Sequence, residues 1–166
     1  MYIKLNYFFI FIFSFIFSEN KESKAYEFFL KAEYENIINN YEKAEALYYE
    51  ASSLYPESLT IIQSLVDIKL YKGKYLEAIA LLKKILNINP NNRQASILLL
   101  KLLIKERFID ESISEIGQVE LVFPDDPEVL LLKAEIYLLN EDWYNLLKIY
   151  KKIFLIDNSQ TYILSK

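Results

Sequence analysis

The sequence predicts an all-α protein built from repeated pairs of helices, and two observations carry this prediction. The 166 residues include only two glycines, Gly73 and Gly117, and four prolines, fewer chain-breaking residues than a turn-rich β sandwich requires. Similar residue types also recur along the chain with a repeat period of about 34 residues. We therefore expect helices joined by short connections.

Four columns of residues share this repeat period. Three of them hold small or apolar residues, and the fourth holds the residue expected to end each unit. The columns are Ala32, Val66, Leu100 and Ala134; Ala44, Ala78, Ser112 and Leu146; Ala51, Ile85, Val119 and Ile153; and Pro56, Pro90, Pro124 and Asn158. Each unit is thus predicted to contain a first helix, a tight turn, and a second helix that ends before a proline.

The second unit carries the local signals most clearly. Gly73 can adopt the positive φ that ends a first helix, and Ala78 follows early in the second helix. Pro90 then breaks the second helix, because proline lacks a backbone N–H. Small residues such as Ala32 and Ala44, where the two helices of a unit are expected to cross, would let their backbones approach closely.

In its period, its small-residue columns and its closing prolines, the chain resembles the tetratricopeptide repeat family, most fully from Leu65 to Pro90. Lys31 and Lys133 stand where the family usually has leucine. The resemblance implies an α-solenoid, a right-handed superhelix whose concave groove is lined by the first helices. The implied units are residues 25–58, 59–92, 93–126 and 127–160, followed by 161–166 as the start of a truncated fifth unit or a frayed tail.

By the same resemblance, several side chains of the first helices face the groove. They are Phe29, Glu33, Ile37, Gln63, Asp67, Tyr71, Ile97, Lys101, Lys105, Leu131, Glu135 and Leu138, and the same columns include Asn36, Leu70, Ile104 and Leu139. The set is unusually apolar and aromatic for exposed positions, and such patches tend to mark binding sites. The implied function is to bind a peptide or helix of another protein. The alternative is that these residues pack against neighbouring helices or further repeats.

The N-terminus is expected to direct the chain out of the cytoplasm. An apolar run from Tyr7 to Phe17 follows Lys4 and is shorter than the roughly 20 residues of a membrane span. The run fits a signal peptide, with cleavage expected after Ser18 or, less close to the run, after Ala25.

This interpretation assigns residues 1–18 to the signal peptide and 19–24 to a short polar linker. It predicts a protein of the periplasm or cell envelope. If the signal stayed uncut, the repeats would instead be tethered to an inner membrane, as part of a larger assembly or of a truncated protein.

Composition weighs against several other functions. The chain has no Cys and no His, a formal charge of −4, and arginine only at Arg93 and Arg107, so no cofactor, metal site or nucleic-acid partner is expected. The best set of acids for a carboxylate-based enzyme is Glu33, Asp67 and Glu135. Acids recur on every predicted helix, however, as they do on solvated faces, so we expect no enzyme.

Overall fold

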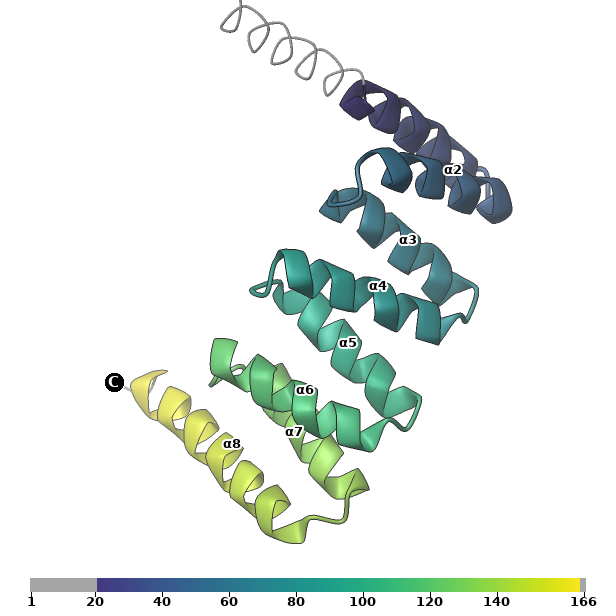
Figure 1. Ribbon diagram of the computed structural model, residues 1–166. Helices are drawn as coiled ribbons and strands as arrows, with labels where there is room; N and C mark the ends of the chain where they lie inside the picture. Colours follow the sequence, from purple (N-terminus) through teal and green to yellow (C-terminus); the bar gives the residue numbers. More distant parts are fainter. Residues whose placement is uncertain (1–20, 165–166) are drawn as a thin grey trace, which may run out of the picture. The chain divides into compact units, whose positions relative to one another are not determined.

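The structure is a computed structural model that describes the backbone of residues 21–164 and the side chains of residues 21–156. Within this range the chain forms eight helices in four consecutive pairs and no strand (Figure 1). The first helix covers residues 21–37, and the others are α2 (Tyr41–Leu54), α3 (Leu59–Tyr71), α4 (Tyr75–Ile88), α5 (Arg93–Lys105), α6 (Ile109–Val122), α7 (Pro127–Leu139) and α8 (Trp143–Leu164). The predicted all-α repeat fold is confirmed.

The first helices α3, α5 and α7 begin one repeat period apart, and the same kind of side chain precedes each start. Ser58, Asn92 and Asp126 each accept a hydrogen bond from the backbone N–H three residues further along the chain. Such N-caps satisfy an otherwise unpaired donor and stabilise a helix by about 1 kcal/mol.

The turn inside each pair of helices repeats one backbone geometry. Its central residue has a positive φ, and the next N–H reaches back to a carbonyl five residues earlier, as in the Schellman motif. The central residues are Asn39 (φ 61), Gly73 (φ 68), Arg107 (φ 62) and Glu141 (φ 56). The expected positive φ at Gly73 is confirmed, and in the other turns a residue with a side chain accepts the same conformation at a cost of about 1 kcal/mol.

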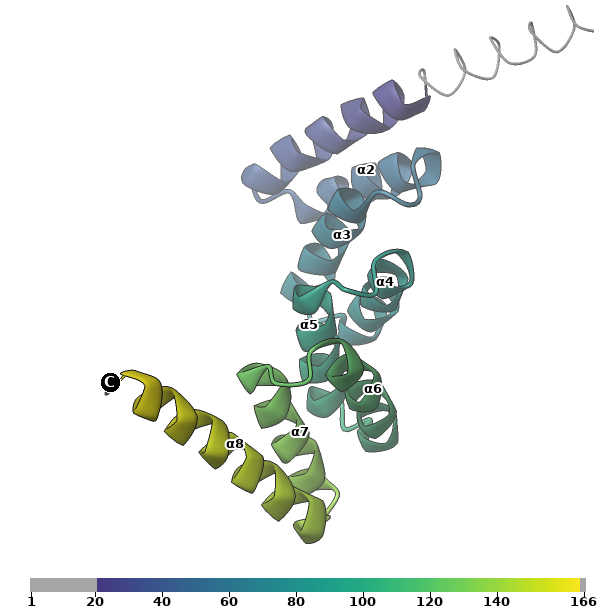
Figure 2. The ribbon, with the colours of Figure 1, turned by 90° about the vertical axis from the view of Figure 1, so that its left-hand side faces the viewer.

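The chain divides into two compact units, Met1–Leu81 and Leu82–Lys166, and α4 contributes to both. In the first unit, the helix over residues 21–37 lies beside α2 (Figure 2) and shares a core with α2 and α3. That core contains Ala32, Ala44, Tyr48, Ala51, Ile61, Leu65 and Ile68. Ala32 and Ala44 are fully buried in it, as expected for residues at a close helix crossing.

In the second unit, α7 packs against α5 and α6 on one side and against α8 on the other. The α5–α6–α7 core contains Ile97, Leu100, Ile104, Ile116, Val119, Val129, Leu132 and Ile136. A smaller cluster of Ala134, Leu146 and Ile149 joins α7 to α8.

A buried lysine links three helices of the first unit. Lys69 of α3 bonds to Glu45 of α2 at 2.5 Å and to Glu77 at the start of α4. Burial by itself lowers the pKa of Lys69, but the hydrogen bonds to both carboxylates outweigh burial and hold this pKa above its usual value. Two carboxylates thus compensate the buried ammonium of Lys69, as the burial of a charge requires.

The fourth pair of helices ends differently from the others. The second helices α2, α4 and α6 each stop two residues before a proline, whereas α8 continues through Asn158 to Leu164. Asparagine keeps the N–H that a helix needs, so the sequence offers no break at this point. Residues 161–164 therefore extend α8 without an intervening turn, and 165–166 lie outside the described residues.

The two glycines give a matched test of the turn geometry. A Cβ at Gly73 or at Gly117 would meet no atom within 4 Å, so only backbone conformation distinguishes the two sites. Gly73→Ala should lower the free energy of unfolding by about 1 kcal/mol, because alanine disfavours a positive φ. Gly117→Ala, inside α6, should raise it by about 1 kcal/mol. Urea unfolding of both variants checks this, and changes of the same sign would contradict the turn assignment.

Candidate partner-binding surface

The predicted groove residues divide between the two compact units. Those of the helix over residues 21–37 and of α3 form the N-terminal wall: Phe29, Glu33, Ile37, Gln63, Asp67 and Tyr71. Those of α5 and α7 form the C-terminal wall: Ile97, Lys101, Lys105, Leu131, Glu135 and Leu138.

Two residues of the N-terminal wall also hold the first unit together. The Glu33 carboxylate accepts hydrogen bonds from the Tyr48 hydroxyl at 2.5 Å and from the Ser64 hydroxyl at 3.2 Å. Burial and the bond to Glu33 raise the pKa of Tyr48. The ring of Phe29 packs against Tyr48 with their centroids 5.9 Å apart. Glu33 is thus an internal acceptor that joins three helices, and it is only half-buried.

Three of the other four residues of the N-terminal wall are exposed to solvent, and Gln63 is half-buried. Ile37 and Tyr71 are exposed large apolar side chains, and they occupy equivalent positions in successive repeats. The Tyr71 ring packs against Tyr41 of α2 with centroids 4.1 Å apart. Exposed Asp67 accepts a hydrogen bond from the Gln63 amide at 3.0 Å. An aromatic pair therefore lies at the end of α3, and a carboxylate lies one turn before it.

A cavity of about 320 Å³ opens at the other end of the N-terminal wall. Its lining is mostly apolar and includes one wall residue, Phe29. The lining residues are Glu22, Ala25, Tyr26, Phe29, Tyr55, Ser58, Thr60 and Ile61. This volume lies at the lower end of the range for ligand pockets and suits an apolar side chain of a partner.

Tyr26 and Thr60 of this cavity were missed by the sequence analysis. They lie one repeat period apart, and each precedes a predicted wall residue by three positions, Phe29 and Gln63 respectively. Residues three positions apart share a helix face, so the periodicity itself contained the signal for this further column.

The C-terminal wall differs from the expectation at Ile97. This side chain is buried in the core of the second unit, together with Ile104 of the same predicted columns. The cluster includes Val129 and Leu132, so α7 covers this part of α5. Exposed apolar groups on the C-terminal wall come instead from α7, at Leu131 and Leu138, with exposed Glu135 between them.

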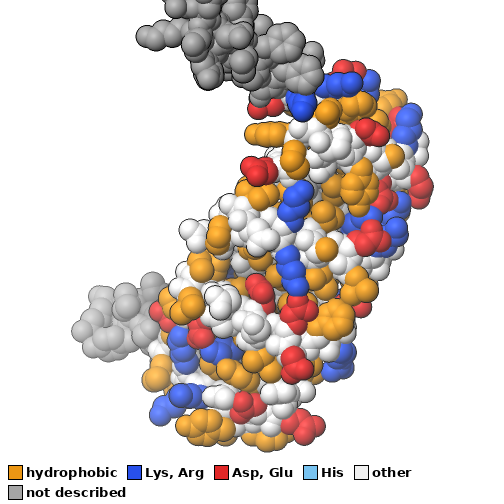
Figure 3. Space-filling view, viewed as in Figure 1, with side chains coloured by type: hydrophobic (Ala, Val, Ile, Leu, Met, Phe, Trp, Pro, Cys, Tyr) orange, Lys and Arg blue, Asp and Glu red, His pale blue; other side chains and the backbone are white. Residues whose placement is uncertain are grey.

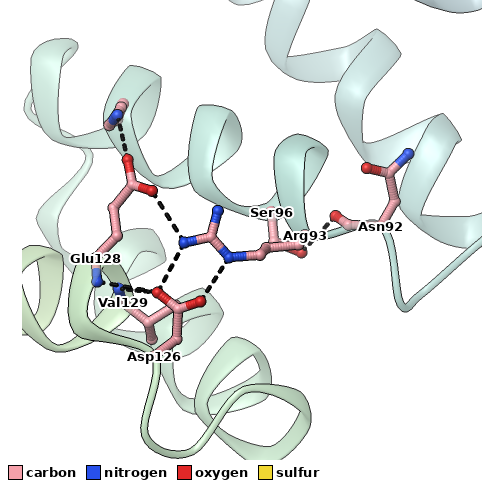
Figure 4. Close-up of polar contacts among 7 residues, drawn as sticks. Asn92, Arg93, Ser96, Asp126, Glu128 and Val129 are labelled. Atoms are coloured by element: carbon pink, nitrogen blue, oxygen red, sulfur yellow. Dashed lines mark hydrogen bonds and ion pairs between the residues drawn. The ribbon is translucent and has the colours of Figure 1, made fainter.

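An ion-pair network joins α5 to α7 at the C-terminal wall (Figure 4). The Arg93 guanidinium donates to both Asp126 oxygens, at 2.5 and 2.9 Å, and to Glu128 at 3.1 Å. Lys101 donates to Glu128 at 2.7 Å. The hydrogen bond from Arg93 holds the pKa of Asp126 below its usual value, despite some burial. Lys101 is therefore already paired with a carboxylate, and exposed Lys105 lies one turn further along α5.

The acids considered for catalysis are placed as follows. Glu33 and Asp67 belong to the first unit, with Glu33 engaged by Tyr48 and Ser64, whereas Glu135 belongs to the second. Among the described residues, no group of three or more potential ligands is close enough to hold a metal ion.

Between residues 21 and 164, no helix combines the length and the hydropathy that crossing a membrane requires. The apolar run from Tyr7 to Phe17 lies outside the described residues.

Comparison with known proteins agrees with this architecture. A tetratricopeptide repeat family model matches residues 69–136. No curated protein sequence matches the chain.

Solved structures of MamA share the fold. MamA from Desulfovibrio magneticus RS-1 is 13% identical with a TM-score of 0.65, covering 82% of this chain and 77% of its own. MamA AMB-1 is 19% identical with a TM-score of 0.67, covering 79% and 72%. MamA MSR-1 is 20% identical with a TM-score of 0.61, covering 76% and 72%. The chain therefore has the helical-repeat fold of these proteins, and residues 69–136 carry the tetratricopeptide repeat pattern.

Proposed function

We propose that this protein is an interaction scaffold that binds a peptide or helix of another protein on the walls formed by its first helices. The observation that carries the proposal is the recurrence of exposed large apolar side chains on these helices. Ile37 and Tyr71 supply them on the N-terminal wall, and Leu131 and Leu138 on the C-terminal wall. Ile37 and Tyr71 are one repeat period apart, and exposed large apolar groups that gather on one set of helices are typical of binding surfaces.

The N-terminal wall suggests what the partner segment contains. The cavity beside Phe29 and Tyr26 would receive an apolar side chain, and the Tyr41–Tyr71 pair would pack against a second one. Tyrosine is frequent at binding hot spots, since it buries a large ring and keeps a polar hydroxyl. Exposed Asp67 between these two points favours a basic residue in the partner.

Export to the periplasm or cell envelope belongs to the same proposal and rests on the N-terminal sequence. Ala25 is only 2% exposed and lies inside the helix over residues 21–37. Cleavage after Ala25 would remove a buried residue from this helix, whereas cleavage after Ser18 would leave the helix whole. The burial of Ala25 supports the earlier site. An uncleaved signal that tethers the repeats to a membrane is the alternative.

Acidic substitutions on the N-terminal wall should weaken partner binding. The full chain would be cross-linked to its partner in the cells that produce it, and the partner identified by mass spectrometry. A peptide of that partner would then be titrated by calorimetry. Ile37→Glu and Tyr71→Glu should each weaken binding at least tenfold, because a hot-spot truncation costs about 2 kcal/mol or more. Both side chains are exposed, so circular dichroism should show unchanged helicity.

The matched control for these variants is Leu121→Glu. Leu121 is an exposed leucine of α6, a second helix, and it lies on neither wall. This variant should bind like the parent. Equal loss in all three variants, or none in any of them, would refute the wall as the binding surface.

The mass of the exported protein tests the location. We expect the mature chain to lack residues 1–18 and to begin at Glu19. Intact-mass spectrometry of protein from fractionated cells measures this directly. A chain that keeps Met1 and sediments with membranes would favour the tethered alternative.

A further inference from the structure

One column of residues is buried in the second helices α2, α4 and α6 but exposed in the second helix α8. Tyr48 of α2 and Leu82 of α4 are 0% exposed, and Ile116 of α6 is 2% exposed. Tyr150 occupies the same place in α8, three repeat periods after Tyr48, yet it is 52% exposed. Its neighbours on this face of α8, Trp143 and Leu147, are 59% and 72% exposed. We name these three residues the α8 stripe.

In the earlier units, the following first helix covers this column. Tyr48 shares its cluster with Ile61, Leu65 and Ile68 of α3. Ile116 shares its cluster with Val129, Leu132 and Ile136 of α7. The described residues contain no helix after α8, and hydrophobic side chains lie at the surface at the foot of Figure 3, where Figure 1 draws the turn into α8. The α8 stripe is thus equivalent to the surface that the following first helix covers in the earlier units.

The first helix of a second copy would be a poor occupant. At the positions where α3 and α7 present Ile61 and Val129, the helix over residues 21–37 presents Glu27. Glu27 is exposed and accepts a hydrogen bond from exposed Lys31 at 2.6 Å. Docking this face on α8 would remove both charges from water, and this costs a large amount of free energy. This face of the helix over residues 21–37 therefore carries a charged pair where α3 carries Ile61 and Leu65.

The charge around the α8 stripe indicates the chemistry of its occupant. Residues 143–156 contain three lysines and no Asp or Glu. Lys148 and Lys151 are exposed beside the stripe, whereas Lys152 is engaged by Asp125 at 3.2 Å and by the Pro124 carbonyl at 2.7 Å. A complementary surface needs apolar side chains at helical spacing with carboxylates on one flank.

We propose that the α8 stripe docks an amphipathic helix of a partner protein, apolar at i, i+3 or i+4 and i+7 with acidic residues on one flank. This helix takes the place that a following first helix has in the earlier units. The α8 stripe shares no residue with either wall.

Trp143 allows a direct test, because it is the only tryptophan of the chain and belongs to the α8 stripe. The probe is a stapled peptide of residues 126–139, the cap and sequence of α7, a first helix that packs Val129, Leu132 and Ile136 against the preceding helices and carries acidic Asp126, Glu128 and Glu135. It contains no tryptophan. Titrated into the full chain, it should shift Trp143 emission to shorter wavelength and protect it from acrylamide, with saturation. A version with all three acids changed to amides should bind at least threefold more weakly.

Two variants, a concentration series of the chain and a titration with vesicles test the proposal. Leu147→Glu, at an exposed position of α8, should abolish saturation, whereas Leu121→Glu on α6 should leave it unchanged. Retained binding by Leu147→Glu, or no emission shift in the parent, overturns the proposal. A shift that depends only on the concentration of the chain would identify a second copy as the occupant. A shift caused only by vesicles containing phosphatidylglycerol would identify a lipid surface. Either result also overturns the proposal.

Discussion

The buried crossing of the two helices in each pair is the constraint on which the rest of this structure depends. In the first unit, Ala32 and Ala44 meet with no exposed surface, and Tyr48 fills the space one turn further along α2. Only small side chains let two helix backbones approach this closely. The Schellman turn then sets the direction of the second helix, with a positive φ at Asn39 and at Gly73.

Because each pair is assembled in the same way, a position one repeat period further on meets an equivalent environment. A residue whose exposure differs from that of its repeat equivalents therefore indicates a difference in the helices around it. Tyr150 is exposed where Tyr48 and Ile116 are buried, and this difference rests on which helix follows rather than on residue type. Charges are also used internally: Glu33 and the Arg93 network join neighbouring helices. The surfaces that remain available to partners are therefore mainly apolar, because many charged side chains already pair with one another.

The sequence predicted those features that depend on residue size and period. Small residues at Ala32 and Ala44 and the positive φ at Gly73 belong to this group, since a helix crossing and a left-handed turn select for them directly. Features that depend on several helices at once were not predictable in this way. The burial of Ile97 requires α7 to cover α5, and the buried charge of Lys69 requires carboxylates from two other helices.

The candidate site was predicted in part. The repeat period located the first-helix positions, and Tyr71 and Leu138 are exposed there. The cavity beside Phe29 was not predicted, because it depends on how the helix over residues 21–37 packs beside α3 and the connection before it, and a repeat period alone does not give that packing. Positive φ at Glu141 was also missed, since the residue type carries no signal for it.

Enlarging one alanine of α2 tests the central constraint most directly. Ala44 is fully buried at the crossing, whereas Ala46, in the same helix, is exposed. Ala44→Leu should lower the free energy of unfolding in urea by about 1–3 kcal/mol, because overpacking forces the two backbones apart. Ala46→Leu should change it by less than about 0.5 kcal/mol. Equal effects of the two substitutions would contradict the close crossing and, with it, the register of the repeat.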